Sequence, residues 1–447
     1  MVSTEPRLTS IRCYNSSQEK KISTFRPCSA AVHKLTLHFC CLLTILYVQS
    51  TAGVQLNLRK PVVTNKTNAL TFQNEELVKV TIKVVEKNGR SLTYQMNTEQ
   101  DVELVRGILN KITGKVEITV VRQSGSDLHL DIKRSSMIIP KNFVKRYFTS
   151  TGKPVVKKLN PRQSFCYFTG KLANFNSSIV SLNLCNGVEG NIEVQQNTLT
   201  LKSYLEKSQI WHKLTRQRVE RHRTSMCGTK GSNQTFHHSD IRNKRQVRAP
   251  AGIKSTTKFL EIYIVMDHQL YRRTGGTVDA SVQRAIDIIN FASVIYQKLD
   301  IFLALVGVEV WNDRNKISYP VYASDPREIS AAGLTTEFSK YRFNEINKHT
   351  ANDNAQLLAD VDLETSIIGY AWLNTICSRT HSSGVIDDTE HSTLTYTAII
   401  LTHELGHNLG FYHTDGQDIK AKCNCPPEEG RDKPTCVMHS VLGIFYE

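Results

Sequence analysis

The chain has 447 residues, which is long enough for two domains that each bury a core of their own. Hydrophobic residues make up 40% of the sequence and charged residues 22%, a balance that is typical of a globular protein and excludes an intrinsically disordered one. The formal net charge is +15, but the sequence contains no nucleic-acid-binding motif, so we expect a basic protein without a nucleic-acid partner.

Residues 1–52 are predicted to be a leader that contains a secretory signal. Leu35–Val48 is an apolar run of about fourteen residues, and small residues follow it up to Ala52. A run of this length is too short for a stable membrane span and suits a signal that is cleaved after Ala52. The long polar stretch before the run leaves three alternatives: a later translation start, an extended leader or a short signal anchor. We expect a secreted protein, with a signal-anchored protein of the secretory pathway as the alternative.

Residues 53–205 are predicted to form a β-rich domain. Apolar and polar residues alternate at strand period in three segments: Leu77–Val85, Val116–Val121 and Leu128–Ile132. Cys166 and Cys185 flank a turn-rich segment, and we expect them to form a disulfide. Three N-x-Ser/Thr sequons predict glycans on exposed loops: Asn65, Asn176 and Asn233.

Residues 206–245 change to a basic, polar and weakly periodic composition, which indicates a linker. The linker ends in Arg242-Asn243-Lys244-Arg245, and Arg242, Lys244 and Arg245 match the signal that proprotein convertases cut. We therefore expect a convertase as a partner and cleavage after Arg245. Seven cysteines follow the leader, and an odd number in a secreted protein indicates one free thiol.

Residues 246–447 are predicted to alternate strands with helices. Phe259–Val265 and Phe302–Val310 have the composition of buried strands. Val278–Leu299 has apolar residues close to helical period and predicts a long packed helix. The alternation implies a mixed, partly parallel sheet with helices on its faces.

His403, Glu404, His407 and His413 form the most specific pattern in the chain. On a helix, His403 and His407 lie one turn apart on one face, so both imidazoles reach a single metal ion. Gly410 lets the chain leave the helix, so that His413 returns as the third ligand. Three histidines leave the fourth position of a zinc ion open, as in a catalytic site, and Glu404 lies beside it as a base for the attacking water.

This motif resembles that of the metzincin zinc endopeptidases, and the rest of the chain resembles their adamalysin (reprolysin) branch, which holds the ADAM proteins and the snake-venom metalloproteases. Further segments carry the resemblance: Lys258–Asp267, Asp353–Leu358, Ile368–Ala371, Cys377 and Cys436–Met438. The resemblance covers roughly residues 53–440. It implies an α/β (α+β) metzincin catalytic domain with a mixed, mostly parallel sheet and long helices, preceded by a β-rich propeptide domain.

The resemblance also implies roles for single residues. Met226-Cys227-Gly228 resembles the cysteine switch of adamalysin propeptides, in which the thiolate of Cys227 would take the fourth zinc position and keep the precursor latent. An unpaired linker thiol is the alternative for Cys227. Met438 would form a hydrophobic floor under the metal, and an extended substrate would add itself to the strand Ile367–Leu373. One catalytic Zn²⁺, protein or peptide substrates and activation by propeptide removal follow from the same resemblance.

Further disulfides are implied by the resemblance alone. Cys425 and Cys436 match a conventional adamalysin pair. Cys377 and Cys423 then lack their usual partners, and three fates stay open for them: a bond with each other, free thiols, or a bond to another chain.

The sequence departs from the adamalysin pattern in two places. Thr414 stands where an Asp usually follows the third histidine, and Asp415 comes one residue later. The chain also ends nine residues after Met438, ahead of the remaining ligands of a Ca²⁺ site whose side-chain ligands Glu261 and Asp353 match by resemblance. We therefore keep two hypotheses: a secreted, latent zinc endopeptidase, and a truncated, catalytically weak or inactive adamalysin-like protein that acts by binding.

Overall fold

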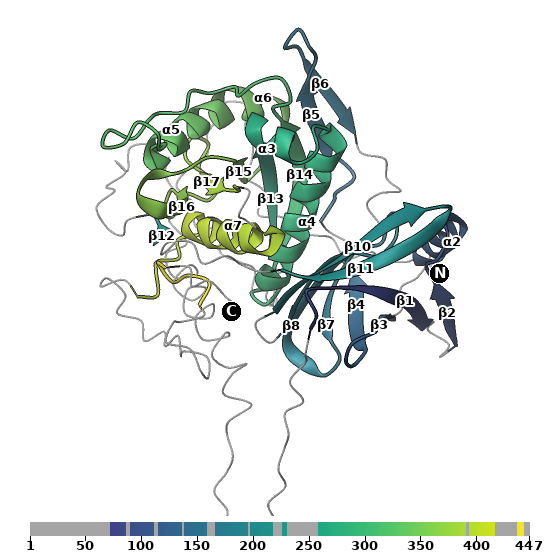
Figure 1. Cartoon of the computed structure of the whole chain (residues 1–447). Coiled ribbons are helices and arrows are strands. Elements are labelled where there is room, and N and C mark those ends of the chain that lie inside the picture. Colours follow the sequence, from purple (N-terminus) through teal and green to yellow (C-terminus); the bar gives the residue numbers. More distant parts are fainter. Residues whose placement is uncertain are drawn as a thin grey trace, which may run out of the picture. The chain divides into compact units, whose positions relative to one another are not determined.

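The computed structural model describes residues 72–85, 90–110, 115–135, 138–158, 166–194, 197–217, 226–229, 258–389, 393–415 and 436–441. They divide into two compact units (Figure 1). The N-terminal unit contains the described residues of 72–135 and 166–217, and the C-terminal unit contains those of 138–158 and 226–441. The predicted leader, the processing site at 242–245, Cys423 and Cys425 lie outside the described residues. No helix among the described residues combines the length and the apolar composition that crossing a membrane requires.

The N-terminal unit is an antiparallel sheet that closes on itself. Its strands follow the order β11-β10-β9-β8-β7-β4-β3-β1-β2, and β11 also pairs with β1. Closure leaves few unpaired backbone groups at strand edges. The elements are β1 (Glu75–Val85), β2 (Ser91–Gln95), α2 (Glu99–Leu109), β3 (Lys115–Val121), β4 (Leu128–Arg134), β7 (Tyr167–Leu172), β8 (Phe175–Asn183), β9 (Glu189–Val194), β10 (Asn197–Glu206) and β11 (Gln209–Arg216).

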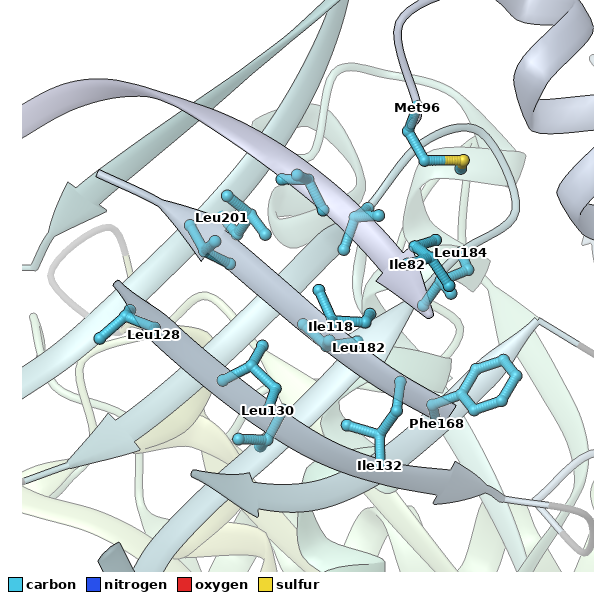
Figure 2. Packing of buried hydrophobic residues seen from close by; sticks show 14 of the residues in the cluster. Ile82, Met96, Ile118, Leu128, Leu130, Ile132, Phe168, Leu182, Leu184 and Leu201 are labelled. Atoms are coloured by element: carbon cyan, nitrogen blue, oxygen red, sulfur yellow. The ribbon is translucent and has the colours of Figure 1, made fainter. Parts of the chain in front are cut away.

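Alternation of apolar and polar residues produces the core of this unit. Every second residue of β1 from Glu76 to Val84 is buried, as a strand with one face on a core requires. Figure 2 shows Ile82, Ile118, Leu130 and Leu182, from four strands, packed together inside the sheet. The three strands predicted from the pattern are confirmed as β1, β3 and β4.

The expectation of a linker from residue 206 onward is wrong for β11. This strand pairs with β10 on one side and β1 on the other, and Ile210 and Leu214 are buried in the core. The alternation of apolar and polar residues did not predict this strand, because the polar His212 faces the core and is 2% exposed, while the apolar Trp211 faces outward and is 42% exposed.

The C-terminal unit is an eight-stranded sheet with helices. Its strands follow the order β12-β16-β17-β15-β13-β14-β5-β6. The elements are β5 (Val144–Phe148), β6 (Pro154–Lys158), β12 (Met226–Cys227), β13 (Lys258–Met266), α3 (His268–Arg273), α4 (Val278–Gln297), β14 (Ile301–Val310), α5 (Ala331–Tyr341), η3 (Arg342–Ile346), α6 (Asn347–His349), β15 (Asn354–Ala359), η4 (Glu364–Ser366), β16 (Ile367–Ala371), β17 (Ser383–Asp387) and α7 (Leu394–Asn408).

The five central strands of this sheet position the site. β14, β13, β15 and β17 run parallel, and β16 pairs antiparallel with β17. The helix α4 contacts both β14 and α7 (Figure 1). The expected mixed, mostly parallel sheet with long helices is therefore confirmed, as are the strands predicted at 259–265 and 302–310.

The hairpin β5–β6 belongs to the C-terminal unit, although the sequence pattern placed these residues in the β-rich domain of 53–205. β5 runs parallel to β14, and β6 pairs antiparallel with β5. Local periodicity identified neither strand, because the partner strand β14 of β5 lies more than a hundred residues further along the chain and β6 is mostly exposed.

Candidate metal centre

The motif lies on α7, a helix that is buried on nearly all sides. All residues from Thr397 to Asn408 are buried, which fits the uncharged sequence before His403. The helix begins where the Thr393 hydroxyl accepts a hydrogen bond from the Tyr396 amide. His403 and His407 therefore lie one turn apart inside the unit and not on a solvated face.

The helix ends in a turn that returns His413 to it. Gly410 has φ +94°, a left-handed conformation that glycine adopts without strain. The Phe411 amide donates to the Gly406 carbonyl at 2.9 Å, and the Gly410 amide donates to the His407 carbonyl at 2.8 Å. These two bonds form a Schellman cap, which terminates the helix and reverses the chain.

Three imidazole nitrogens converge on one point. His407 Nε2 lies 2.9 Å from His403 Nε2 and 3.0 Å from His413 Nε2, and the last two atoms are 3.2 Å apart. Ligand nitrogens about 2.0–2.1 Å from a tetrahedral ion lie roughly 3.3 Å from one another, so the spacing is close to that of a zinc site.

The histidine tautomers make this cluster a site for a cation. His403 Nδ1 lies 2.5 Å from the Val437 carbonyl, and His407 Nδ1 lies 2.7 Å from the Phe411 carbonyl. A carbonyl only accepts, so each Nδ1 carries the proton and each Nε2 presents a lone pair. Lone pairs that face one another at 2.9 Å repel unless a cation lies between them, and the residues therefore fit a bound metal ion.

The ligand histidines are held in their neutral form. Burial lowers the pKa of His403 to about 3 and that of His413 to about 4, and it lowers the pKa of His407 well below its usual value. A histidine must be neutral to bind a metal ion.

The thiol of Cys227 completes the group. Its Sγ lies 3.3 Å from His407 Nε2, and the ligand atoms of Cys227, His403, His407 and His413 all lie within 4.8 Å of one another. Cys227 is a free cysteine, and among the described residues this is the one group of such side chains that is suited to hold a metal ion. Three nitrogens and one sulfur are donors of the kind that Zn²⁺ prefers.

The strand β12 holds Cys227 in place. It runs parallel to β16, and the Gly228 amide donates to the Gly369 carbonyl at 3.0 Å. On its other side, the Cys227 amide donates to the Ser440 carbonyl at 2.9 Å. The thiol therefore enters the site on a segment that is hydrogen-bonded along both sides.

Glu404 lies beside this group. It is fully buried, and the side chains of Cys227 and Thr229 lie within hydrogen-bonding reach of its carboxyl. Burial raises the pKa of Glu404 to about 8. Gly369 faces the carboxylate, since a Cβ built on Gly369 would lie 2.5 Å from Glu404 Oε1. The carboxyl is therefore held close to the metal ligands, where a base for an attacking water has to lie.

Met438 packs against the helix that carries His403 and His407. It is 1% exposed, and a Cβ on Gly406 would lie 2.6 Å from Met438 Sδ. The Thr414 amide donates to the Met438 carbonyl at 2.8 Å. Asp415, displaced by one residue from the family pattern, accepts a hydrogen bond from the Ser440 amide at 2.9 Å. Both residues after His413 therefore bind the segment around Met438.

The remaining candidate residues are cysteines outside the metal centre and the predicted calcium ligands. Cys166 and Cys185 form a disulfide. Cys377 and Cys436 are both disulfide-bonded, which excludes a free thiol at Cys377. Asp353 is buried, and its carboxylate accepts a hydrogen bond from the Glu261 amide at 2.9 Å.

Two residues that the sequence analysis did not single out support the site. Thr229 Oγ1 donates to the Ala371 carbonyl at 3.0 Å and accepts from the Ala371 amide at 3.1 Å, which fastens the Cys227 segment to β16. The Asn408 side chain donates to the carbonyls of Trp372 and Ser383 and accepts from Gln356 at 2.9 Å, which fixes the end of α7 next to His407. Neither role has a signal in the local sequence, because each depends on partners distant along the chain.

A mostly parallel sheet, a buried helix with two histidines one turn apart, and a third histidine returned by a glycine turn define a zinc metalloprotease domain. Residues 258–446 match the sequence profile described as "Reprolysin (M12B) family zinc metalloprotease". The chain is also similar to "Disintegrin and metalloproteinase domain-containing protein 12" of Mus musculus, with 30% identity over 324 residues, which is 71% of this chain and 34% of that protein. The chain therefore contains, at residues 258–446, a domain that matches the reprolysin family. It spans about a third of the length of that relative.

Proposed function

We propose that the chain is a secreted, latent zinc endopeptidase that hydrolyses peptide bonds of proteins after its propeptide has been removed. The observation that carries this proposal is the convergence of Cys227 with His403, His407 and His413. In this proposal, a free thiol from a segment upstream of the predicted processing site takes the position that an attacking water needs.

His403, His407 and His413 would hold the ion. Zinc, when bound there, polarises the peptide carbonyl and stabilises the negative charge that develops on its oxygen. Glu404 takes a proton from the attacking water and then delivers it to the leaving amine. The burial of Glu404 next to the ligand histidines supports this role, because burial raises the affinity of its carboxylate for a proton.

The substrate would lie extended along β16. The segment Met226–Cys227 pairs with β16 and so occupies the edge that a substrate strand would use. One segment therefore blocks two requirements of catalysis, the fourth ligand position and the binding edge. Removal of the segment after a convertase has cut behind Arg245 would open both.

Secretion is part of the same proposal. The signal predicted before Ala52, the sequons and the Cys166–Cys185 disulfide support an oxidising, extracellular destination. Asn176 is exposed on β8 and accessible to a glycan.

A calcium ion bound by Glu261 and Asp353 stays a prediction. The Asp353 carboxylate accepts from the Glu261 amide and lies near the Arg342 guanidinium, so a cation would compete with partners already present. A rise in melting temperature with added Ca²⁺ that Asp353→Asn abolishes supports the site, and no response to Ca²⁺ counts against it.

Two variants of the purified protein test the proposed function. Glu404→Ala, cut and freed of its propeptide, should retain zinc and lose cleavage of casein. Full activity of that variant would refute the proposed base. Uncut Cys227→Ala should be more active than uncut unsubstituted protein, and equal activity would refute the switch. Absence of cleavage by the mature unsubstituted protein would favour the alternative in which the chain acts by binding.

A further inference from the structure

Segments that precede Arg245 form both outer edges of the sheet in the C-terminal unit. β12 covers β16 at one edge, and the hairpin β5–β6 covers β14 at the other, with five strands between them (Figure 1). After the proposed cut behind Arg245, both segments belong to the propeptide. The hairpin lies at the opposite edge from Cys227, so it takes no part in the metal centre.

The hairpin is joined to the protease by its backbone. β5 extends the sheet in parallel register, with Val144 opposite Gly307. The side chain of Asn312 donates to the Phe148 carbonyl at 2.8 Å and accepts from the Phe148 amide at 2.7 Å, so it continues the strand pairing where β14 ends. Just before β5, the Ile138 carbonyl accepts from the Leu305 amide at 2.7 Å. This is strand addition to a sheet edge, in which main-chain hydrogen bonds provide affinity.

An aromatic side chain anchors the hairpin in the protease core. Phe148 is 6% exposed and belongs to the same buried cluster as Trp311, Leu334 and Phe338. Lys316 Nζ lies 3.7 Å from the centroid of the Phe148 ring, in cation–π contact with its face. Buried aromatic anchors of this kind dominate the energetics of protein interfaces.

A buried ion pair joins the hairpin to β14. Arg146 Nη1 donates to Glu309 Oε2 at 2.8 Å, and the two side chains are 6% and 0% exposed. The partners that residues 258–389 provide for Glu309 are neutral: the Tyr341 and Tyr263 hydroxyls and the Trp311 indole N–H. The propeptide therefore supplies the positive charge for a carboxylate buried in the protease. Loss of one partner of a buried pair is costly because the other charge is left uncompensated.

We propose that the hairpin Val144–Lys158 is a second attachment of the propeptide, independent of Cys227, that keeps the propeptide bound to the protease after the chain has been cut. This inference rests on the proposed cleavage behind Arg245. Cleavage alone then yields a noncovalent complex in which Cys227 stays close to the metal centre. Activity appears when the hairpin leaves β14, and not at the moment of the cut.

The test measures binding between the two pieces of the cut chain. In the full chain, residues 242–245 are replaced by the recognition sequence of a site-specific protease, and Cys227→Ser removes the thiol. After cleavage, the pieces should still elute together in gel filtration. Arg146→Met should raise the Kd of the complex about 100-fold or more, from the known cost of breaking a buried pair. Lys158→Met, on the exposed side of the same hairpin, is the matched control and should leave the Kd unchanged.

Separation of the pieces on Cys227→Ser alone, or an unchanged Kd in Arg146→Met, would overturn the proposal. The double variant Arg146→Met with Glu309→Gln removes both charges and should bind more tightly than Arg146→Met alone. Failure of this restoration would mean that misfolding had caused the loss, and it would also count against the proposal. The binding measurement depends neither on a convertase nor on the proteolytic activity of this protein. If the pieces stay together but the mature protein cleaves no substrate, the proposed function is refuted and this inference still holds.

Discussion

Gly369→Ala tests the placement of the proposed base. A Cβ at this position would lie 2.5 Å from Glu404 Oε1, 2.8 Å from its Cγ and 2.9 Å from its Cδ. Nonbonded carbon atoms normally approach to about 3.5–4.0 Å, so something must move by about 1 Å. β16 is held by its pairing with β17, in which Gly369 lies opposite Ile386. We therefore expect the Glu404 carboxylate to move.

The expected consequence is a loss of rate without a loss of metal. A misplacement of about 1 Å at a reacting group costs about 100-fold in rate, so kcat/KM of the mature enzyme on a generic peptide should fall by about that factor. The ligand histidines lie on α7 and in the turn after it, so the zinc content should stay at that of the unsubstituted protein.

Gly307→Ala is the matched control for this variant. Gly307 lies on β14, and its Cβ would lie 2.4 Å from Tyr263 Cε2, against a side chain that takes no part in the metal centre. It should lower the melting temperature as Gly369→Ala does and leave kcat close to the unsubstituted value. If Gly369→Ala retains full kcat/KM with full zinc, then the reasoning about Glu404 is refuted.

Three further predictions concern latency and stability. Thr229→Val removes both hydrogen bonds to Ala371, each worth about 1 kcal/mol, so the uncut precursor should show about 10-fold or more residual activity, and unchanged latency would contradict the role of Thr229. Burial lowers the pKa of His212 to about 4 from 6.5, so the unfolded chain binds more protons than the folded chain between these pH values. The free energy of unfolding of the N-terminal unit should therefore fall by about 3 kcal/mol between pH 6.5 and pH 4, measured by hydrogen exchange in β10 and β11. His212→Gln should flatten this pH dependence, and an unchanged slope would contradict the assignment. Gly107→Ala, in the exposed face of α2 with no atom near its Cβ, should stabilise the unit by about 0.5–1 kcal/mol in urea unfolding, and a loss of stability would contradict the helix assignment.

Short-range patterns predicted the centre of the site. The histidines at 403 and 407 are one helical turn apart, and the glycine at 410 forms the turn that returns the third, so the geometry is encoded within eleven residues. The fold class was predicted for a similar reason, because strand and helix periods repeat over windows of seven to twenty residues. The strand β1 and the helix α4 are examples.

Features that depend on partners distant along the chain could not be predicted from the sequence. The β11 strand was interpreted as linker because a buried histidine replaced the apolar residue that alternation predicts. The hairpin at 144–158 is held by Arg146, Phe148 and β14, and no local pattern reveals that Arg146 pairs with Glu309, 163 residues away. Thr229 and Asn408 act through backbone groups of other strands, which residue types do not indicate. Cys227 was predicted to lie near the histidines only from the family resemblance, because no local pattern relates it to residues so far along the chain.

Zinc K-edge X-ray absorption tests the central claim most directly. The account predicts one zinc ion per uncut chain, with three nitrogens and one sulfur about 2.0–2.1 and 2.3 Å away. After cleavage and complete removal of the propeptide, the sulfur should be replaced by a light atom while the three nitrogens remain. A protein without zinc, or an uncut precursor whose zinc has no sulfur neighbour, would contradict the account.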